Sequence, residues 1–251
     1  MATFSKNQAV MKNVLDEYSL IGYKKFNLNY LKKFTDESKF TEKVLQEVID
    51  KQYKKINRIK KGIKNTDSFV YLGFPHVPIA ILDGKNFSGT DNVILYEYKG
   101  ALSNSSDKGF FELKKVYNSE MELSSNYKEK VLVGKALALK IEQSFPVGDD
   151  KIKELLGDIP IVYLKNNDVK RWGVESYSDV DKFAKEFYKI LQWASEKGID
   201  KIHIFATTPV SLTFSLGRVI EHYHPEIIAY NYNNNKYDWY INCTNKKVKK
   251  I

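Results

Sequence analysis

The chain of 251 residues is long enough for one large domain or for two small fused halves. Its share of hydrophobic residues, 43%, supports a packed core and excludes a disordered chain. The formal net charge of +9 favours anionic partners such as nucleic acids, nucleotides and acidic lipids, with a lysine-rich bias of composition as the alternative explanation. Three arginines (Arg58, Arg171 and Arg218) are too few for extensive readout of duplex DNA.

Cellular location is constrained by the single cysteine and by the absence of long apolar runs. Cys243 has no second cysteine with which to form an internal disulfide, which fits a reducing cytoplasm. Residues 1–20 contain no apolar block behind a basic start, so no signal peptide is expected. Apolar runs such as 199–206 are far shorter than the roughly 20 residues that span a bilayer. We therefore expect a cytoplasmic protein without a membrane segment.

Residues 5–65 are predicted to be helical. Apolar residues from Val44 to Ile59 recur at spacings of three and four, and Thr41 precedes them as a helix-starting residue. The stretch 51–64 is very basic. It is predicted to be a solvated helix face, with a phosphate-contacting face as the alternative.

From Ser68 onward the pattern changes to short apolar runs rich in β-forming residues. The predicted strands of this part are 69–73, 79–82, 93–98, 112–116 and 130–142. Asp83-Gly84 is predicted to be a turn that ends the second of these strands. Residues 102–108 are predicted to form a polar loop.

The last hundred residues alternate between predicted helices and strands. The predicted helices are 149–156, 178–197 (with Ser178 as N-cap and Gly198 after its end) and one that starts at 207–209 and runs through Tyr223. The predicted strands are 159–164, 201–206, 226–232 and 236–243, the last two joined by a turn at 233–235. This alternation predicts βαβ crossovers and a largely parallel sheet.

The segment after the strand 201–206 combines hydroxyl side chains with a helix start. Pro209 suits the first helical turn, and Thr207, Thr208 and Ser211 surround it. Free peptide N–H groups at a helix start bind phosphate and other anions, and ligands of parallel α/β sheets lie beyond the carboxyl ends of the strands. The turn is therefore a candidate phosphate cradle, with simple helix capping as the alternative.

These segments together resemble SAVED domains. The resemblance rests on the strand IHIFA, the turn and helix ATTPVSLTFSLGR and the strand IIAYNY, and on the earlier FVYLGFPHVPIAILDG and VILYEYKG, within residues 65–243. SAVED domains consist of two fused CARF-like, Rossmann-like halves and serve bacterial antiphage systems of the CBASS and CRISPR types. They bind cyclic di-, tri- or tetranucleotides, and binding drives an oligomerisation that activates an effector.

The resemblance implies an α/β fold of two such halves with largely parallel sheets, preceded by N-terminal helices. The expected division is a helical segment packed on the sensor (1–65) and a sensor domain (66–251) with halves of about 66–145 and 146–251. Family members usually carry a fused effector on the N-terminal side. The helical segment is too short for such an enzyme, so we expect the effector on a separate chain and a homo-oligomer induced by the ligand.

Matching by position places the candidate ligand contacts in the strand-end loops of both halves and on one late strand. Arg171 and Trp172 are expected to close over the ligand, and the two tyrosines of the strand 226–232 to stack on its bases. Helix or loop anchoring and sheet packing are the alternatives for these residues. The predicted ligand-binding residues are Phe74, Pro75, His76, Tyr98, Lys99, Lys165, Arg171, Trp172, Thr207, Thr208, Pro209, Ser211, Tyr230 and Tyr232.

Enzymatic alternatives have little support in the motifs. His222 and His224 lie two residues apart, which points them to different helix faces, and His76 and His203 are isolated. No phosphate-binding glycine loop, nucleophile elbow or paired-cysteine motif occurs, so no cofactor, metal or catalytic residue is predicted. Two other functions remain open: a ring nuclease that cleaves its cyclic ligand by positioning alone, and a general nucleic-acid-binding protein that uses the basic face at 51–64.

Overall fold

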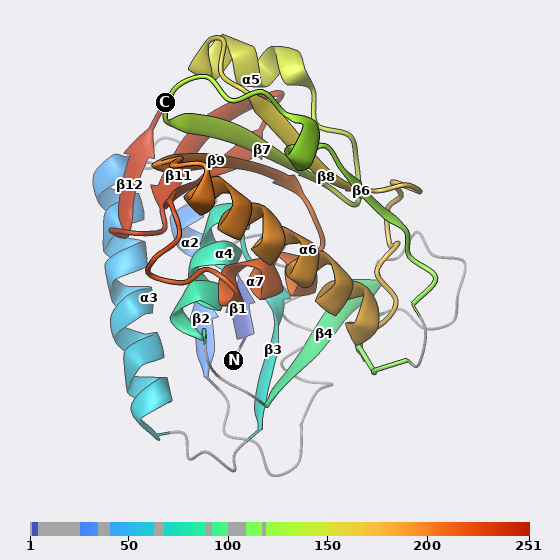
Figure 1. The fold of residues 1–251 in the computed structure, drawn as a ribbon. Helices are drawn as coiled ribbons and strands as arrows, with labels where there is room; N and C mark the ends of the chain where they lie inside the picture. Colours follow the sequence, from blue (N-terminus) through green and yellow to red (C-terminus); the bar gives the residue numbers. More distant parts are fainter. Residues whose placement is uncertain are drawn as a thin grey trace.

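The structure is a computed structural model that describes residues 2–4, 26–34, 41–62, 68–88, 92–99, 109–116 and 119–251. Two β-sheets lie on opposite sides of a central pair of helices (Figure 1). Helix α4 (Val77–Asn86), which belongs to the first half, contacts strands of the second sheet. Helix α7 (Val210–Arg218), which belongs to the second half, contacts strands of the first sheet. The two sheets therefore share one core across this helix pair.

The first sheet is mainly parallel and has the strand order β2-β1-β3-β4-β5. Strands β1 to β4 pair in parallel, and only β5 runs antiparallel to its neighbour. Its strands are β1 (Ala2–Phe4), β2 (Asn27–Asn29), β3 (Phe69–Phe74), β4 (Val93–Lys99) and β5 (Gly109–Glu112).

The second sheet is larger and has the order β12-β11-β10-β9-β7-β8-β6. Its centre, from β10 to β8, is parallel, whereas β6, β11 and β12 pair antiparallel with their neighbours. Its strands are β6 (Leu123–Ser125), β7 (Ala136–Glu142), β8 (Ile161–Asn166), β9 (Lys201–Thr207), β10 (Glu226–Asn233), β11 (Lys236–Asn242) and β12 (Lys247–Lys250).

Local sequence signals account for the longer helices. In α3, the apolar stripe buries residues from Leu45 to Ile59 while the lysines of its basic face stay exposed. In α6, Ser176 and Asp179 form a reciprocal capping box. The helices are α2 (Leu31–Phe34), α3 (Glu42–Gly62), α4 (Val77–Asn86), α5 (Asp149–Leu156), α6 (Tyr177–Glu196), α7 (Val210–Arg218) and the short 3₁₀ helix η2 (Tyr127–Glu129).

The same arrangement occurs twice in the chain. In the first sheet, β3 is followed by α4, β4 and β5. In the second, β9 is followed by α7, β10 and β11, and the strand order β2-β1-β3-β4-β5 has its counterpart in β8-β7-β9-β10-β11. The predicted fold of two fused Rossmann-like halves with largely parallel sheets is thereby confirmed.

The central helices α4 and α7 pack on each other through one glycine each. A Cβ atom on Gly84 would overlap the backbone carbonyl of Phe214, and a Cβ on Gly217 would overlap that of Ile81. Ile81 lies three residues before Gly84 in α4, and Phe214 lies three residues before Gly217 in α7, so each helix presents one glycine and one carbonyl to the other. Only glycine permits this backbone approach, which fixes the two halves against each other.

Two predicted elements are wrong in the first half. Asn27–Asn29, predicted as helix, is strand β2, and residues 79–82, predicted as a strand, belong to helix α4. The run 79–82 is buried on all sides, and a fully buried helix and a buried strand have the same apolar pattern. Pro78 stands in the first turn of the helix, and the expected turn at Asp83-Gly84 lies inside it.

Smaller corrections concern element ends. Residues 113–116 and 130–135 lie outside the strands that were predicted to include them, and α7 ends at Arg218 rather than at Tyr223. The N-cap of α6 is Ser176, whereas the Ser178 hydroxyl donates to the carbonyl of Val116. The polar loop 102–108 lies outside the described residues.

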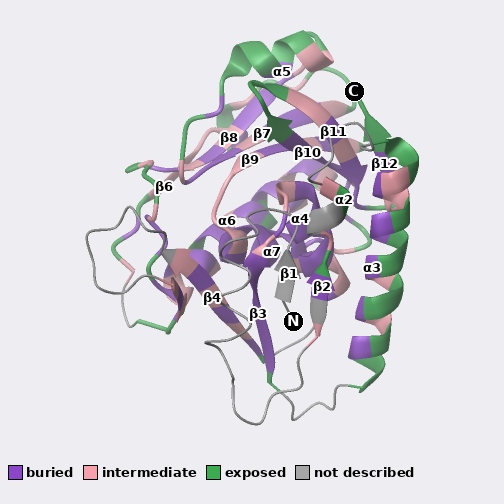
Figure 2. Ribbon diagram, turned by 180° about the vertical axis from the view of Figure 1, so that it is seen from behind, coloured by how far each residue is buried: buried purple, intermediate pink, exposed green. Residues whose placement is uncertain are grey.

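Buried residues concentrate in the central strands and in α4, α6 and α7, whereas α5 is largely exposed (Figure 2). The main core joins both sheets through the central helices. A smaller cluster lies under α5, on the outer face of the second sheet, and includes Ile152, Phe205 and Tyr230. Segments that follow β8 and β9 contact the carboxyl end of β4, through Trp172 with Tyr98 and through Ser211 with Glu97.

Candidate ligand-binding site at the strand ends

Aromatic side chains from both halves meet beyond the strand ends. Phe74 ends β3, and its ring lies 4.8 Å from Tyr98 and 5.4 Å from Phe110. The ring of Trp172, in the segment after β8, lies 6.4 Å from Tyr98. Tyr98 therefore connects the first half with the second, and three of the predicted ligand residues (Phe74, Tyr98 and Trp172) come together here.

The segment that carries Trp172 has an unfavourable backbone conformation. Trp172 has a φ of 65°, in the left-handed region that bulky residues rarely adopt. The Arg171 guanidinium lies 5.0 Å from the Trp172 ring centroid, within the range of a cation–π contact. The segment is held to β7 by the Lys170 N–H, which donates to the Gln143 carbonyl at 3.0 Å.

The Thr207–Ser211 turn at the start of α7 is occupied by a carboxylate of the chain itself. Glu97 of β4 accepts the backbone N–H of Ser211 at 3.0 Å and the Ser211 hydroxyl at 2.6 Å through one oxygen. Its other oxygen accepts the N–H of Tyr98 at 3.0 Å. The Ser211 N–H, expected to face a phosphate, therefore binds an internal anion from the other half, as the positive end of a helix favours.

Glu97 is buried, and this burial raises the pKa of its carboxyl group above the usual range, because removal from water disfavours the charged form. The hydrogen bonds from Ser211 and Tyr98 act in the opposite direction and limit the rise. The Glu97 carboxyl group, which accepts three hydrogen bonds, therefore joins β4 of the first half to α7 of the second.

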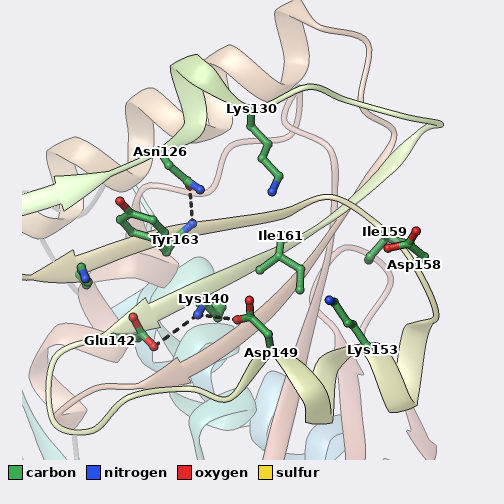
Figure 3. A pocket seen from close by; sticks show the side chains of 11 residues that line it. Asn126, Lys130, Lys140, Glu142, Asp149, Lys153, Asp158, Ile159, Ile161 and Tyr163 are labelled. Carbon is green, nitrogen blue, oxygen red and sulfur yellow. Dashed lines mark hydrogen bonds and ion pairs between the residues drawn. The ribbon is translucent and has the colours of Figure 1, made fainter.

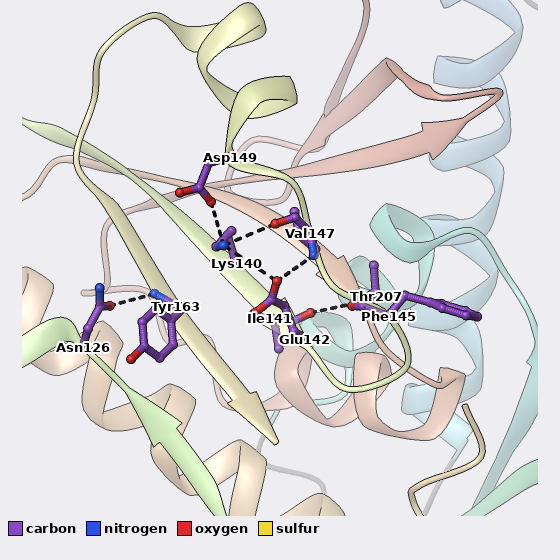
Figure 4. A network of polar contacts seen from close by, with 9 residues as sticks. All are labelled: Asn126, Lys140, Ile141, Glu142, Phe145, Val147, Asp149, Tyr163 and Thr207. Carbon is purple, nitrogen blue, oxygen red and sulfur yellow. Dashed lines mark hydrogen bonds and ion pairs between the residues drawn. The ribbon is translucent and has the colours of Figure 1, made fainter. Parts of the chain in front are cut away.

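The threonines of the turn are also engaged. Thr207 donates to the carbonyl of Phe145 (Figure 4). Thr208 and Thr213 share a hydrogen bond at 2.7 Å. The Pro209 carbonyl accepts the hydroxyl of Thr213 at 2.7 Å. The Thr207 bond ties the turn to the segment that follows β7, and the Thr213 bonds fix the turn on the first residues of α7.

That segment is fixed by a second polar network, visible in Figure 4. Glu142 at the end of β7 accepts the N–H of Val147 at 2.6 Å. Lys140 forms an ion pair with Asp149 at 2.6 Å and donates to the Val147 carbonyl at 3.2 Å. The connection between β7 and α5 is consequently tied to the strand beneath it.

The other predicted residues of the first half point in different directions. Pro75 is buried. The His76 ring stacks on Phe34 at 4.6 Å and lies 5.6 Å from Trp239 of β11, so it packs between the two halves. The side chain of Lys99 lies outside the described residues. His76 therefore lies near the end of β3, as predicted, but its ring packs against aromatic side chains of both halves.

The two tyrosines of β10 are not brought to the aromatic cluster. Tyr230 is 4% exposed, its ring stacks on Phe205 at 4.6 Å, and its hydroxyl lies 2.8 Å from Nδ1 of His203. Burial lowers the pKa of His203 to about 4 and raises that of Tyr230. Tyr232 is exposed and packs on Tyr237. Both tyrosines contact residues of the second sheet.

Lys165 lies at the end of β8 and lines a cleft of about 460 Å³ on the outer face of the second sheet (Figure 3). Its ammonium lies 5.2 Å from the Tyr163 ring. Lysine and carboxylate side chains from β7, β8 and α5, and from the residues that follow η2 and α5, surround the cleft, and Ile159 and Ile161 form its apolar part. The cleft-lining charged residues are Lys130, Lys140, Lys153, Lys165, Glu142, Asp149 and Asp158.

Sequence reasoning missed two buried polar residues near the strand ends. Glu97 lies in an alternating strand pattern, and its position on the buried face was the available signal. Gln143 directly follows β7, has a fully buried side chain and lies beside Thr207 and Gly173. No motif distinguishes this glutamine in the sequence.

Within the described part of the chain, no group of three or more His, Cys, Asp or Glu residues is arranged to hold a metal ion. Burial raises the pKa of the Cys243 thiol to about 12, so this cysteine stays protonated at neutral pH. Among the described helices, none has the length and apolar character that a bilayer crossing requires.

The repeated strand order and the helix pair packed through glycine define a protein of two fused Rossmann-like halves. The chain belongs to the SAVED family: the family model described as "SMODS-associated and fused to various effectors sensor domain" matches residues 52–242. No curated protein matches the sequence.

Solved structures share the fold of this chain. The Acinetobacter baumannii Cap4 SAVED/CARF-domain containing receptor with the cyclic trinucleotide 3'3'3'-cAAA superposes with a TM-score of 0.59 at 14% identity, covering 94% of this chain and 50% of the receptor. The same receptor with 2'3'3'-cAAA gives 0.59 at 17% identity, covering 94% and 49%. The Moraxella osloensis Cap4 receptor gives 0.56 at 18% identity, covering 84% and 45%. The chain spans about half the length of these receptors.

Proposed function

We propose that this SAVED domain is a sensor of antiphage defence that binds a cyclic oligonucleotide where the strand ends of its two halves meet. The observation that carries the proposal is the contact of Tyr98 with Trp172, which brings aromatic surface from both halves to one edge. Aromatic rings beside a basic surface are the usual platform for unpaired bases. Family membership and the cyclic trinucleotides held by the solved receptors support the same ligand class.

Phosphates of the ring are proposed to contact side-chain groups rather than the Ser211 N–H. The Ser211 N–H already binds Glu97, so the guanidinium of Arg171, which lies beside the Trp172 ring, is the stronger candidate for phosphate neutralisation. The remaining predicted contacts at the edge, Phe74, Thr207 and Thr208, would line the ring.

We further propose that the bound ring drives self-association and that the effector acts from a separate chain. Residues of the predicted N-terminal segment, 1–65, supply β1, β2 and α3; β1 pairs with β3, and β2 pairs with β1. This supports a segment that completes the sensor. A ligand transmits a signal only if it binds one assembly state more tightly than the other, so association and ring binding have to be coupled.

The direct test is a binding screen against cyclic di-, tri- and tetranucleotides that includes 3'3'3'-cAAA and 2'3'3'-cAAA, with linear triadenylate as control. A ring at about 100 times its Kd should stabilise the fold by about 2.7 kcal/mol, which a thermal shift assay detects. Sedimentation with and without the ring then measures association. Chromatography of the ring after incubation reports linear products if the protein is a ring nuclease.

A matched pair of variants locates the site. Trp172→Ala should weaken ring binding by about tenfold, whereas Tyr188→Ala, which removes an exposed aromatic of α6, should leave it unchanged. Equal binding of cyclic and linear oligonucleotides with a steep salt dependence would instead identify a general nucleic-acid-binding protein.

A further inference from the structure

Gln143 is a buried amide whose hydrogen-bonding capacity is unused within the described structure. Its backbone is well held, because its N–H donates to the Thr207 carbonyl and its carbonyl accepts the Lys170 N–H. Its side chain is 0% exposed, and neither the amide oxygen nor the amide nitrogen has a hydrogen-bond partner among the described residues. An amide buried in this way destabilises the folded state, so its presence requires an explanation.

The segment Lys170–Gly173 covers this amide. A Cβ atom on Gly173 would overlap Nε2 of Gln143, so the amide lies directly against the backbone of the glycine. The preceding residue, Trp172, has the left-handed φ of 65°. A strained residue and an unpaired amide thus lie together, and both costs fall if the cover moves and a ligand takes the amide.

The position of Gln143 matches the proposed ring site. It follows β7 at the strand-end edge, it is bonded to Thr207 of the neighbouring strand, and the ring of Trp172 in its cover contacts Tyr98 of the other half. A glutamine amide offers two donors and one acceptor, which fits the edge of a nucleobase and in particular N6 and N7 of adenine.

We propose that Gln143 recognises a base of the bound ring, and that the backbone at Gly173 covers its amide until the ligand shifts it, while Trp172 stays beside Tyr98. The inference rests on the proposed function and deepens it, because it names the group that distinguishes one base from another. The aromatic rings supply stacking that every base accepts, whereas the Gln143 amide supplies selectivity.

Gln143→Met tests the inference, because methionine keeps the length of the side chain and removes both polar atoms. We expect the variant to be at least as stable as the unaltered protein toward urea. It should bind 3'3'3'-cAAA about 10- to 100-fold more weakly, the loss expected for one bidentate base contact. Its preference for 3'3'3'-cAAA over 3'3'3'-cGGG should shrink toward one. Gln143→Asn, which withdraws the amide by one methylene, should lose affinity similarly and guards against a packing defect of methionine.

The matched control is Gln52→Met. Gln52 is also a buried glutamine, 1% exposed, but its Nε2 donates to Asp83. Its replacement should lower stability toward urea and leave ring affinity unchanged, because it removes a satisfied bond away from the strand-end edge.

Three results would overturn the inference. Unchanged ring affinity and base preference in Gln143→Met and Gln143→Asn would remove the recognition role while leaving the proposed function intact. A loss of stability in Gln143→Met as large as in Gln52→Met would show that the amide is satisfied without a ligand. Failure of the unaltered protein to bind any ring would overturn the proposed function, and the inference with it.

Discussion

The buried contact between Glu97 and the start of α7 predicts a strong and specific dependence of stability on one carboxylate. Glu97→Ala leaves three donors without an acceptor: the N–H and hydroxyl of Ser211 and the N–H of Tyr98. Each unpaired buried donor costs about 1–3 kcal/mol, and removal of a desolvated carboxylate returns part of that sum. We expect the free energy of unfolding to fall by about 3–5 kcal/mol.

Companion variants separate the parts of this effect. Glu97→Gln keeps one acceptor but presents an NH₂ group to one of the donors, so a loss of about 1–3 kcal/mol is expected. Ser211→Ala should cost about 1.5–3 kcal/mol in the unaltered protein and much less in the Glu97→Ala background. The exposed Glu129→Ala serves as control and should change stability by less than about 0.5 kcal/mol.

Urea unfolding at neutral pH measures all four variants, and a double-mutant cycle gives the coupling energy. The pH dependence provides a second readout. Because burial raises the pKa of Glu97, the folded protein holds a proton at pH values where the unfolded chain has released it. Its contribution to stability therefore falls as pH rises above the unfolded value of about 4.3, and Glu97→Gln abolishes this contribution. Additive effects of Glu97→Ala and Ser211→Ala would refute the contact.

Three further predictions follow from other parts of the fold. Gly84→Ala forces the backbones of α4 and α7 apart and should lower the free energy of unfolding in urea by about 3 kcal/mol. Gly62→Ala, with open space around it, should be neutral or stabilising by about 0.5 kcal/mol. Equal effects of the two substitutions would contradict the close approach of the helices. Burial lowers the pKa of His203 to about 4, so stability should fall as pH drops from about 6.5 toward 4, and His203→Gln should flatten this slope by about 1–3 kcal/mol across the range, measured against the unaltered protein. The buried Cys243 thiol, whose pKa burial raises to about 12, should resist a thiol reagent in the native protein and react fully in denaturant; rapid native labelling would contradict its burial.

The second half was predicted more accurately than the first for a physical reason. Its helices are amphipathic with clear ends, as in 149–156, and its last strands are joined by turns that contain asparagine. The run 79–82 lies in the central helix pair and is buried on all sides, so the spacing of its apolar residues does not distinguish a helix from a strand. The strand Asn27–Asn29 has only three residues, too short for an alternating pattern to appear.

The sequence predicted where the candidate site lies better than it predicted which side chains contact one another there. Strand-end position identified Phe74, Tyr98 and Trp172, which the fold does bring together. Tyr230 was selected for its position on β10, but side chains of the second sheet and of α5 cover its ring. Such covering depends on contacts between segments far apart in sequence, which a local pattern does not show. The Glu97 contact joins residues far apart in sequence, so no local pattern could reveal it.

The reciprocal packing of Gly84 and Gly217 has a consequence for what the protein can distinguish. A symmetric dimer of identical subunits must offer a ligand two equal walls. In this chain the two strand-end loops differ, with Phe74-Pro75-His76 in one half and Thr207-Thr208-Pro209 in the other, because both halves are encoded in a single polypeptide. Under the proposed function, these two unlike loops would favour one orientation of a ring whose linkages are not all the same.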